Sequence, residues 1–299
     1  DADGVLIAAN SVANANTLKW TYFICAVVLV IVSLPMFFYG FKNTKERYTS
    51  DTTPPSLGHN LGLLFKNDQL LLILISGILG AARTVYMYTG SLYFAKYVLG
   101  NEAVYSILTI LVVPGGAIAT VLIPWFTKHL GKKNTYIYVH VLGAAMYFIG
   151  RNGGYNNSSN LLWLAIGFVL LGLPQGINNV ITYAMIGDTV EYLEWKTGER
   201  AEGICFSMQT FINKISMAVG AFIGVMAYGI SGISPSDPYN TVTPEGSEKL
   251  WAVLILSGAI SMVATIIPML FYKVTESKQR EYVKEIEERK AAKAAKTAE

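Results

Sequence analysis

The sequence predicts an all-α polytopic membrane protein, and its composition, its apolar runs and the placement of its basic residues support that prediction. The chain has 299 residues, of which 53% are hydrophobic and only 14% are charged, whereas soluble domains carry about 25% charged residues. The charges are segregated, and between them lie apolar runs of about 20 residues, the length that crosses a ~30 Å hydrocarbon layer. The net charge of +3 reflects the segments between and after these runs. It does not indicate nucleic-acid binding.

The apolar runs predict seven transmembrane helices, at residues 18–41, 68–98, 102–127, 135–151, 160–187, 203–230 and 248–273. Lysine and arginine concentrate in the segments after the first, third and fifth runs and in the tail, whereas the opposite loops hold only Arg151 and Lys249. Loops rich in basic residues face the cytoplasm. We therefore expect the N-terminus outside, the C-terminus inside, and the chain in the cytoplasmic membrane.

The segments outside the runs differ in character. Residues 1–17 have no basic n-region and no signal-peptide apolar segment, and we interpret them as an external loop of a chain whose earlier spans lie upstream. Residues 42–67 contain a Pro-Pro pair and turn formers, which is typical of a linker. This linker separates one span from a six-helix bundle over 68–273. Residues 274–299 alternate in charge and predict a solvated cytoplasmic helix.

Glycine and proline recur inside the runs at mid-membrane depth. VVPGGA occupies residues 112–117, GLPQG occupies 172–176, and GAFIG occupies 220–224. Such residues are compatible with kinks beside a transporter cavity and equally with ordinary close packing of helices. The two cysteines, Cys25 and Cys205, both fall in spans, so no disulfide framework is indicated.

The sixth run holds an ionisable residue at its middle. Lys214 lies about eleven residues into the run, or ~16 Å at 1.5 Å per residue. A charge at that depth costs at least ~2.5–3.5 kcal/mol, so it must face protein or water. Thr210 precedes Lys214 by four residues and Gln209 precedes Asn213 by four, which places these groups on one side of the helix. The alternative is a structural lysine bonded to backbone carbonyls.

Two further runs carry polar groups at similar depth. The fifth run has a polar stripe with i, i+3, i+4, i+7 spacing, made of Gln175, Asn178, Asn179, Thr182 and, continuing it, Tyr183. The second run has Arg83 near its middle, on the same side as Tyr86, Gly90 and Tyr93. Amides, hydroxyls, tyrosines and two cations suit a polyhydroxylated solute. We therefore expect a shared wet cavity, although Arg83 is as compatible with a structural pair to a carboxylate upstream.

Residues 187–202, GDTVEYLEWKTGERAE, join the fifth and sixth runs with dense charge on the predicted cytoplasmic side. Alternating access needs an inside gate that closes and reopens, and exposed ion pairs worth ~0.2–1 kcal/mol each are weak enough to break in every cycle. A polar loop with incidental charge is the alternative interpretation.

The stretch GDTVEYLEWKTGERAEGICFSMQTFINK at 187–214 closely resembles the signature that joins the tenth and eleventh helices of the glycoside–pentoside–hexuronide:cation symporters, the major-facilitator family that includes melibiose permease. KERY at 45–48, LYFAKYVLG at 92–100 and HLGKK at 129–133 are supporting matches. The resemblance implies that the seven spans correspond to helices six through twelve of a twelve-helix fold. Residues 68–273 would then form its C-terminal bundle.

The resemblance also implies a function, namely secondary active symport of a sugar or glycoside with a cation by alternating access. It places Gln209, Thr210 and Lys214 near the sugar and cation sites. It implies that four residues form an ionic lock against the N-terminal bundle on the cytoplasmic side, namely Asp188, Glu191, Arg200 and Lys132. The coupling cation would be Na⁺, H⁺ or Li⁺, bound mainly by the N-terminal half, so we expect no cofactor and no metal site here. Asn179 stands where melibiose permease has a sugar-contacting tryptophan, which puts a galactoside in doubt.

Other classes fit less well. A seven-span receptor or retinal-type pump would share the span count and a buried lysine, but such a pump carries its lysine in the seventh span and has no linker after the first. An intramembrane enzyme finds no support, because no H-E-x-x-H or G-x-S-x-G motif occurs and the three histidines are scattered. Within transport, a hexuronide is the alternative to a neutral glycoside, since Arg83 and Lys214 both suit a carboxylate.

Overall fold

A computed structural model of the chain describes residues 2–44, 56–83, 85, 95, 103–154, 161–232 and 242–298. Within these ranges every regular element is a helix, and the chain divides into two compact units, residues 1–54 and 55–299. Four described helices are long and apolar enough to cross a membrane, or five if a bent pair at 58–79 is counted as one span. The prediction of an all-α polytopic membrane protein is confirmed.

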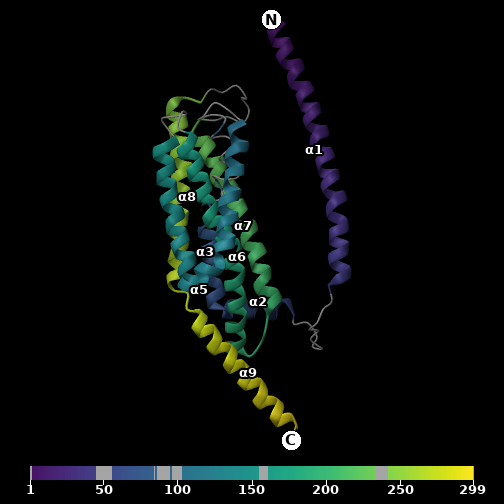
Figure 1. Cartoon of the computed structure of the whole chain (residues 1–299), viewed down its shortest axis with the longest axis vertical. Helices are drawn as coiled ribbons and strands as arrows, with labels where there is room; N and C mark the ends of the chain where they lie inside the picture. Colours follow the sequence, from purple (N-terminus) through teal and green to yellow (C-terminus); the bar gives the residue numbers. More distant parts are fainter. Residues whose placement is uncertain are drawn as a thin grey trace. The chain divides into compact units, whose positions relative to one another are not determined.

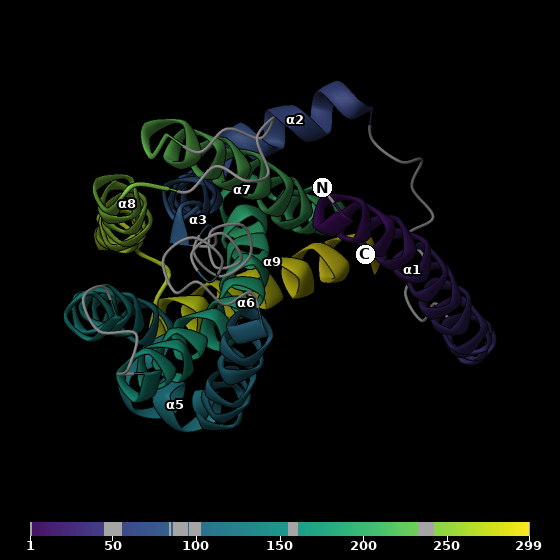
Figure 2. The ribbon, with the colours of Figure 1, turned by 90° about the horizontal axis from the view of Figure 1, so that it is seen from above.

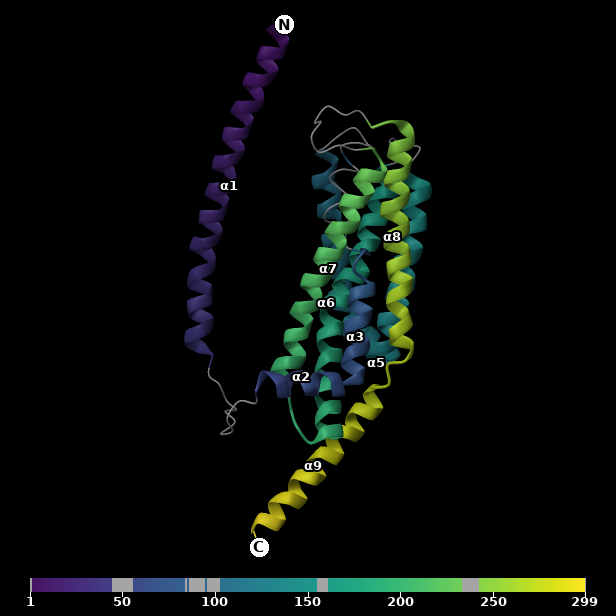
Figure 3. The same cartoon turned by 180° about the vertical axis from the view of Figure 1, so that it is seen from behind.

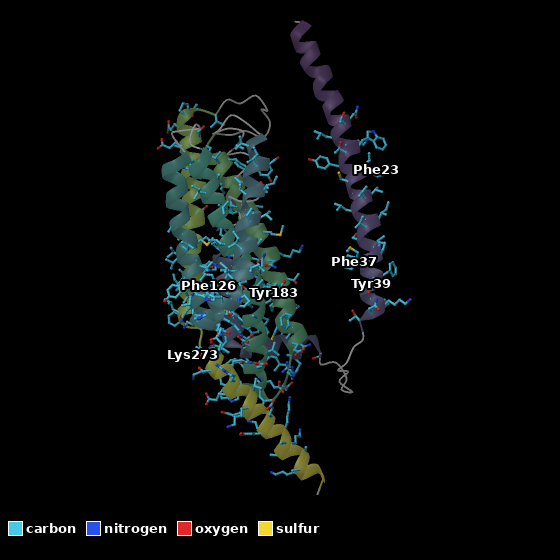
Figure 4. All side chains as sticks on the ribbon, in the orientation of Figure 1. Phe23, Phe37, Tyr39, Phe126, Tyr183 and Lys273 are labelled. Atoms are coloured by element: carbon cyan, nitrogen blue, oxygen red, sulfur yellow. The ribbon has the colours of Figure 1, made fainter. Side chains whose placement is uncertain are left out.

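The first unit contains one long helix, α1 (Ala2–Asn43). Its side chains point outward on all sides (Figure 4), and Phe23, Phe37 and Tyr39 are 59%, 76% and 74% exposed. A helix that is apolar all round belongs in lipid or in a large core. The helix begins at Ala2, so residues 2–17, which were predicted as a loop, are helical, and their external position stays a prediction. Five alanines and the absence of proline in that segment favour the helix.

The second unit is a bundle in which long helices run side by side (Figures 1 and 2), namely α3 (Asp68–Leu79), α5 (Ala103–Gly154), α6 (Leu161–Thr197), α7 (Glu202–Ile230) and α8 (Pro244–Leu270). α5 consists of two helices that meet at Gly131, where φ is 77°, so it contains two of the predicted spans. Leu70, Ile181 and Leu193 are fully buried in the core. The count of seven spans stays a prediction, because residues 86–94 and 96–102 lie outside the described part.

A short helix occupies the end of the predicted linker. α2 (Leu57–Lys66) lies across the end of the bundle (Figure 3) and meets α3 at 87°. The side chain of Ser56 accepts from the His59 N–H at 3.3 Å and begins the helix. At the bend, the side chain of Asn67 accepts from Leu70 N–H at 3.1 Å and donates to Thr189 O at 2.9 Å. Residues 57–66 of the predicted linker are therefore helical and carry their own capping residue, and their role as a linker stays a prediction.

The glycines of the third and fifth runs bring α5 and α6 into backbone contact. A methyl group added to Gly172 would lie 2.8 Å from Gly116 N, and one added to Gly176 would lie 2.9 Å from Gly116 Cα. Real Cβ atoms do not approach backbone so closely. The sequence left two roles open for these glycines, kinks beside a cavity and close helix packing. The structure shows that they serve close helix packing.

We expect Gly176→Val to destabilise the bundle, because the added side chain would enter the α5 backbone and overpacking costs about 1–3 kcal/mol or more. The measurement is the melting temperature of the purified protein in detergent, which should fall by several degrees. Gly203→Ala is the matched control, because nothing lies within 4 Å of an added Cβ there. A melting temperature for Gly176→Val equal to that of the control would contradict the packing role.

Candidate functional site

Four predicted site residues lie on the neighbouring helices α6 and α7, and the packing of these helices determines the depth of each residue along the bundle. The two helices are antiparallel and joined at 198–201 (Figures 1 and 3), and a Cβ on Gly187 would lie 3.9 Å from Phe206 Cζ. At 1.5 Å per residue, Tyr183 and Thr210 each lie about 6 Å from that contact, and Asn179 and Lys214 each lie about 12 Å from it. The fold thus brings these residues to two matched levels of neighbouring helices.

The polar residues on these helices are divided between an exposed face and a buried face. Exposed are Asn179, Tyr183, Thr210, Asn213 and Lys214, which we call the polar face; Tyr183 is labelled in Figure 4. Asn178, Thr182 and Gln209 are instead only 7%, 7% and 4% exposed, and Gln175 is half-buried. The single stripe predicted for α6 is therefore split, because consecutive residues are about 100° apart on a helix.

The buried polar residues bond mainly within their own helices. Thr182 Oγ1 donates to Asn178 Oδ1 at 3.3 Å, and Gln209 Nε2 lies 3.4 Å from Asn213 Oδ1. Lys214 makes no hydrogen bond or ion pair with the residues that the structure describes. A lysine at mid-span is not stable against lipid. The polar face is thus the side of the bundle that needs water or further protein against it.

Arg83 lies just beyond a break in α3. The helix ends at Leu79, and Arg83, only 8% exposed, donates from Nη1 to Gly80 O at 3.2 Å. Hydroxyl groups of α8 bond the carbonyls at the break: Thr265 Oγ1 donates to Ser76 O and Ser261 Oγ donates to Leu79 O, both at 2.6 Å. Such bonds make an irregular backbone tolerable at membrane depth. Three residues expected beside Arg83 lie outside the described part, namely Tyr86, Gly90 and Tyr93.

The residues predicted for a gate pair with partners in their own unit. Lys132 Nζ lies 2.7 and 2.6 Å from the two carboxylate oxygens of Asp188, and the side chains are 25% and 10% exposed. Burial raises the pKa of the Asp188 carboxyl, although the Lys132 ammonium group opposes that shift. The expectation of weak, exposed pairs is therefore wrong for Asp188, since its pair is largely removed from water.

The other two gate residues are also engaged. Arg200 Nη1 lies 2.8 Å from Glu194 Oε2, and the guanidinium also contacts Glu202. Glu191 accepts a hydrogen bond from Gln279 of the tail helix, α9 (Glu276–Ala298). A lock against an N-terminal bundle stays a prediction for all four residues.

The tail is docked against the bundle. Tyr282 and Ile286, four residues apart on α9, are each 8% exposed, and the Tyr282 ring lies 4.6 Å from Trp195 and 5.7 Å from Tyr192, measured between centroids. Both partners belong to the last turns of α6. The prediction of a solvated helix is therefore wrong for the face of α9 that carries Tyr282 and Ile286. The alternating charges of the segment dominated the prediction, and the apolar i, i+4 pair was overlooked.

A family model described as MFS/sugar transport protein matches residues 3–276. The chain belongs to this family. Membership of a sugar transport family decides against the receptor and retinal-pump alternatives. It also agrees with the resemblance on which the site residues were predicted.

Several curated relatives of the chain are named for a sugar or a sugar derivative. The chain is 27% identical over 278 residues to the glucuronide carrier protein homolog of Escherichia coli K12, covering 90% of this chain and 58% of the relative. It is 28% identical over 273 residues to a putative sulfoquinovose importer of Salmonella typhimurium LT2, covering 90% and 56%. It is 25% identical over 259 residues to the isoprimeverose transporter of Lactiplantibacillus pentosus, covering 85% and 52%. The chain thus spans little more than half the length of these relatives.

Several residues that support the site in this chain were not identified from the sequence. Ser76, Ser261 and Thr265 support the α3 break, and Glu276 contacts the α5 reversal, where its Oε1 accepts from Lys132 N–H at 2.5 Å. A hydroxyl in a span carries little signal by itself. For α9, the i, i+4 pair of Tyr282 and Ile286 was a usable signal.

We expect the docking of α9 to weaken only at acid pH. Lys290 and Arg200 hydrogen bond to Glu194 and outweigh the effect of burial, so the pKa of Glu194 is lowered from its usual 4.5. An acid with a lowered folded pKa stabilises the docked state above its unfolded pKa, and this stability is lost as the pH falls through the folded pKa. A nitroxide at Glu281→Cys, in a Cys25→Ser chain, should therefore gain mobility only below about pH 4.5. The same transition in a Glu194→Gln chain would contradict this cause.

Proposed function

We propose that the chain forms the C-terminal part of a symporter that moves a sugar or glycoside together with Na⁺, H⁺ or Li⁺ across the cytoplasmic membrane. The N-terminus of the chain would lie outside and the C-terminus in the cytoplasm. A second bundle, encoded upstream, would cover the polar face and hold most of the cation ligands. Substrate would then bind near the midplane, between the two bundles, as in other transporters built from two halves.

The observation that carries this proposal is the polar face itself. Asn179, Tyr183, Thr210, Asn213 and Lys214 are exposed on neighbouring helices, and Lys214 lies near mid-depth of its span. A structural lysine would be expected to bond to carbonyls of its own bundle, and Lys214 has no such partner in the described part of the chain. Amide and hydroxyl groups beside an aromatic ring match the donors, acceptors and CH faces of a sugar.

Uptake by the full-length protein in proteoliposomes tests the proposal. An imposed sodium or proton gradient should drive accumulation of a labelled sugar. Asn179→Ala and Thr210→Ala should each raise the KM about tenfold, since one lost hydrogen bond costs about 1–1.5 kcal/mol. Thr127→Ala is the matched control, because Thr127 Oγ1 bonds Ile123 O of its own helix at 2.9 Å. Unchanged KM values in both site variants would remove the polar face from the binding site.

An anionic sugar is the second candidate, favoured by Arg83 and by the glucuronide carrier homolog among the relatives. Arg83 is 8% exposed, and a guanidinium group can bind a carboxylate with two hydrogen bonds. Arg83→Gln should then lower kcat/KM for a glucuronide by about 10–150-fold, the loss expected for a charge-assisted hydrogen bond. Uptake of a neutral glycoside should remain. An equal loss for both substrates would instead indicate a structural role for Arg83.

A further inference from the structure

The first residue of α9 caps the reversal inside α5. Gly131 has φ of 77°, a conformation that favours glycine, and Lys132 follows it. Glu276 Oε1 accepts a hydrogen bond from the backbone N–H of Lys132 at 2.5 Å. Glu276 Oε2 lies so close to Gly131 that an added Cβ would be 2.9 Å from it. The carboxylate therefore holds the chain at the point where the two helices of α5 meet.

The residue that Glu276 holds is also the partner of Asp188. The Lys132 ammonium group contacts both carboxylate oxygens of Asp188 on α6. Next to it, Lys133 Nζ donates to Leu270 O at 3.0 Å and to Tyr272 O at 2.7 Å, just before α9 begins. Two consecutive lysines thus tie the α5 reversal to α6 on one side and to the chain that leads into α9 on the other.

Further along, α9 bonds to the last turns of α6. Gln279 donates to Glu191, and Trp195 Nε1 donates to Glu285 Oε2 at 2.7 Å. One turn further, Arg289 Nη1 donates to Trp195 O at 2.8 Å and Lys290 Nζ lies 2.7 Å from Glu194 Oε1. Bonds at successive turns, together with the buried Tyr282 ring, make α9 a fixed part of this end of the bundle.

We infer that α9 is a strap that sets the gate, and that Glu276 is a positioning residue for the Lys132–Asp188 pair. This inference rests on the proposed function, in which the gate opens once in each transport cycle. Glu276 contributes an acceptor that fixes the Lys132 backbone. The negative charge of Glu276 is not required for that role. The Glu276 carboxylate lies close enough to Asp188 to raise the pKa of the Asp188 carboxyl. Removing the acceptor frees Lys132 and favours the state that is open to the cytoplasm.

The strap is tested by reagent access to the cytoplasmic end of the polar face. The full-length protein carries Phe206→Cys as its single cysteine, after Cys25→Ser, Cys205→Ser and the replacement of any cysteine outside these 299 residues, and Phe206 is 39% exposed on α7. In inside-out vesicles, a membrane-impermeant maleimide reacts with this cysteine when the gate is open. Glu276→Ala should raise the rate about 5–10-fold, the factor that corresponds to one hydrogen bond. Glu276→Gln, which keeps the acceptor, should restore the wild-type rate.

The controls separate the strap from the proposed function. Glu287 is exposed on the same helix, and Glu287→Ala should leave the rate unchanged. If Glu276→Ala matches Glu287→Ala while saturating substrate still alters the wild-type rate, the strap inference fails and the transporter stands. If substrate never alters the rate, the proposed function fails. Should Glu276→Ala not accumulate, Glu285→Ala tests the strap without touching the reversal, and an unchanged rate there overturns it.

Discussion

Lys214→Ala in the full-length protein is expected to abolish concentrative sugar uptake while leaving membrane insertion intact. The ammonium group lies near mid-depth on the polar face, at the level of Asn179, and it has no partner among the described residues. A hydrogen bond to a charged group is worth about 1.5–3 kcal/mol, which corresponds to a factor of about 10–150 in kcat/KM. If Lys214 lies at the proposed sugar and cation site, loss of its charge would add to that factor.

Gradient-driven uptake and membrane abundance are the two measurements for Lys214→Ala. Insertion should improve slightly, because a central lysine opposes it. Lys249→Ala is the control, because Lys249 belongs to no proposed site. Its Nζ lies 2.7 Å from Glu245 Oε1 in an exposed ion pair at the start of α8. Normal accumulation by Lys214→Ala would end the role proposed for this lysine, whereas loss of the protein from the membrane would indicate a structural one.

The sequence predicted which side chains are unusual but not which way all of them face. Depth along a helix follows from counting residues, and this count is what singled out Lys214 and Arg83. Direction follows from the neighbouring helices. Asn178 and Asn179 are adjacent in sequence, yet the first is buried and the second is exposed. The i, i+4 relation kept Asn179 with Tyr183 and Asn178 with Thr182, so the pattern was sound within each pair.

The long-range partners were out of reach of a single sequence. Lys132 and Glu276 are separated by 144 positions, and neither residue is unusual for its segment. Ser76 and Thr265, 189 positions apart, bond each other reciprocally at the α3 break. For glycine the difficulty was different, because one pattern fits both kinks and close packing. Only the contact of Gly172 and Gly176 with Gly116 decided between them.

The Lys132–Asp188 pair carries the second large expected effect. Asp188→Ala should destabilise the bundle by about 3 kcal/mol, because removing one member of a largely buried ion pair leaves its partner uncompensated. Lys132→Ala should cost a similar amount, for Asp188 is the more buried of the two, at 10% exposure. If the pair acts as the proposed gate, both single variants should also lose concentrative uptake, since the gate would no longer close.

A double-mutant cycle separates this pair from its surroundings. The Lys132→Ala/Asp188→Ala protein buries no unpaired charge, so its loss of stability should fall short of the sum of the single losses by about 1–3 kcal/mol, the range found for residues in contact. Thermal melting in detergent measures the stability of each variant, and concentrative uptake measures whether the proposed gate still works. If the pair acts as a gate, the exchanged variant Lys132→Asp/Asp188→Lys should recover part of the uptake that each single variant loses. Strictly additive losses in stability would mean that the two charges do not interact, and Glu276 would then have no pair to position.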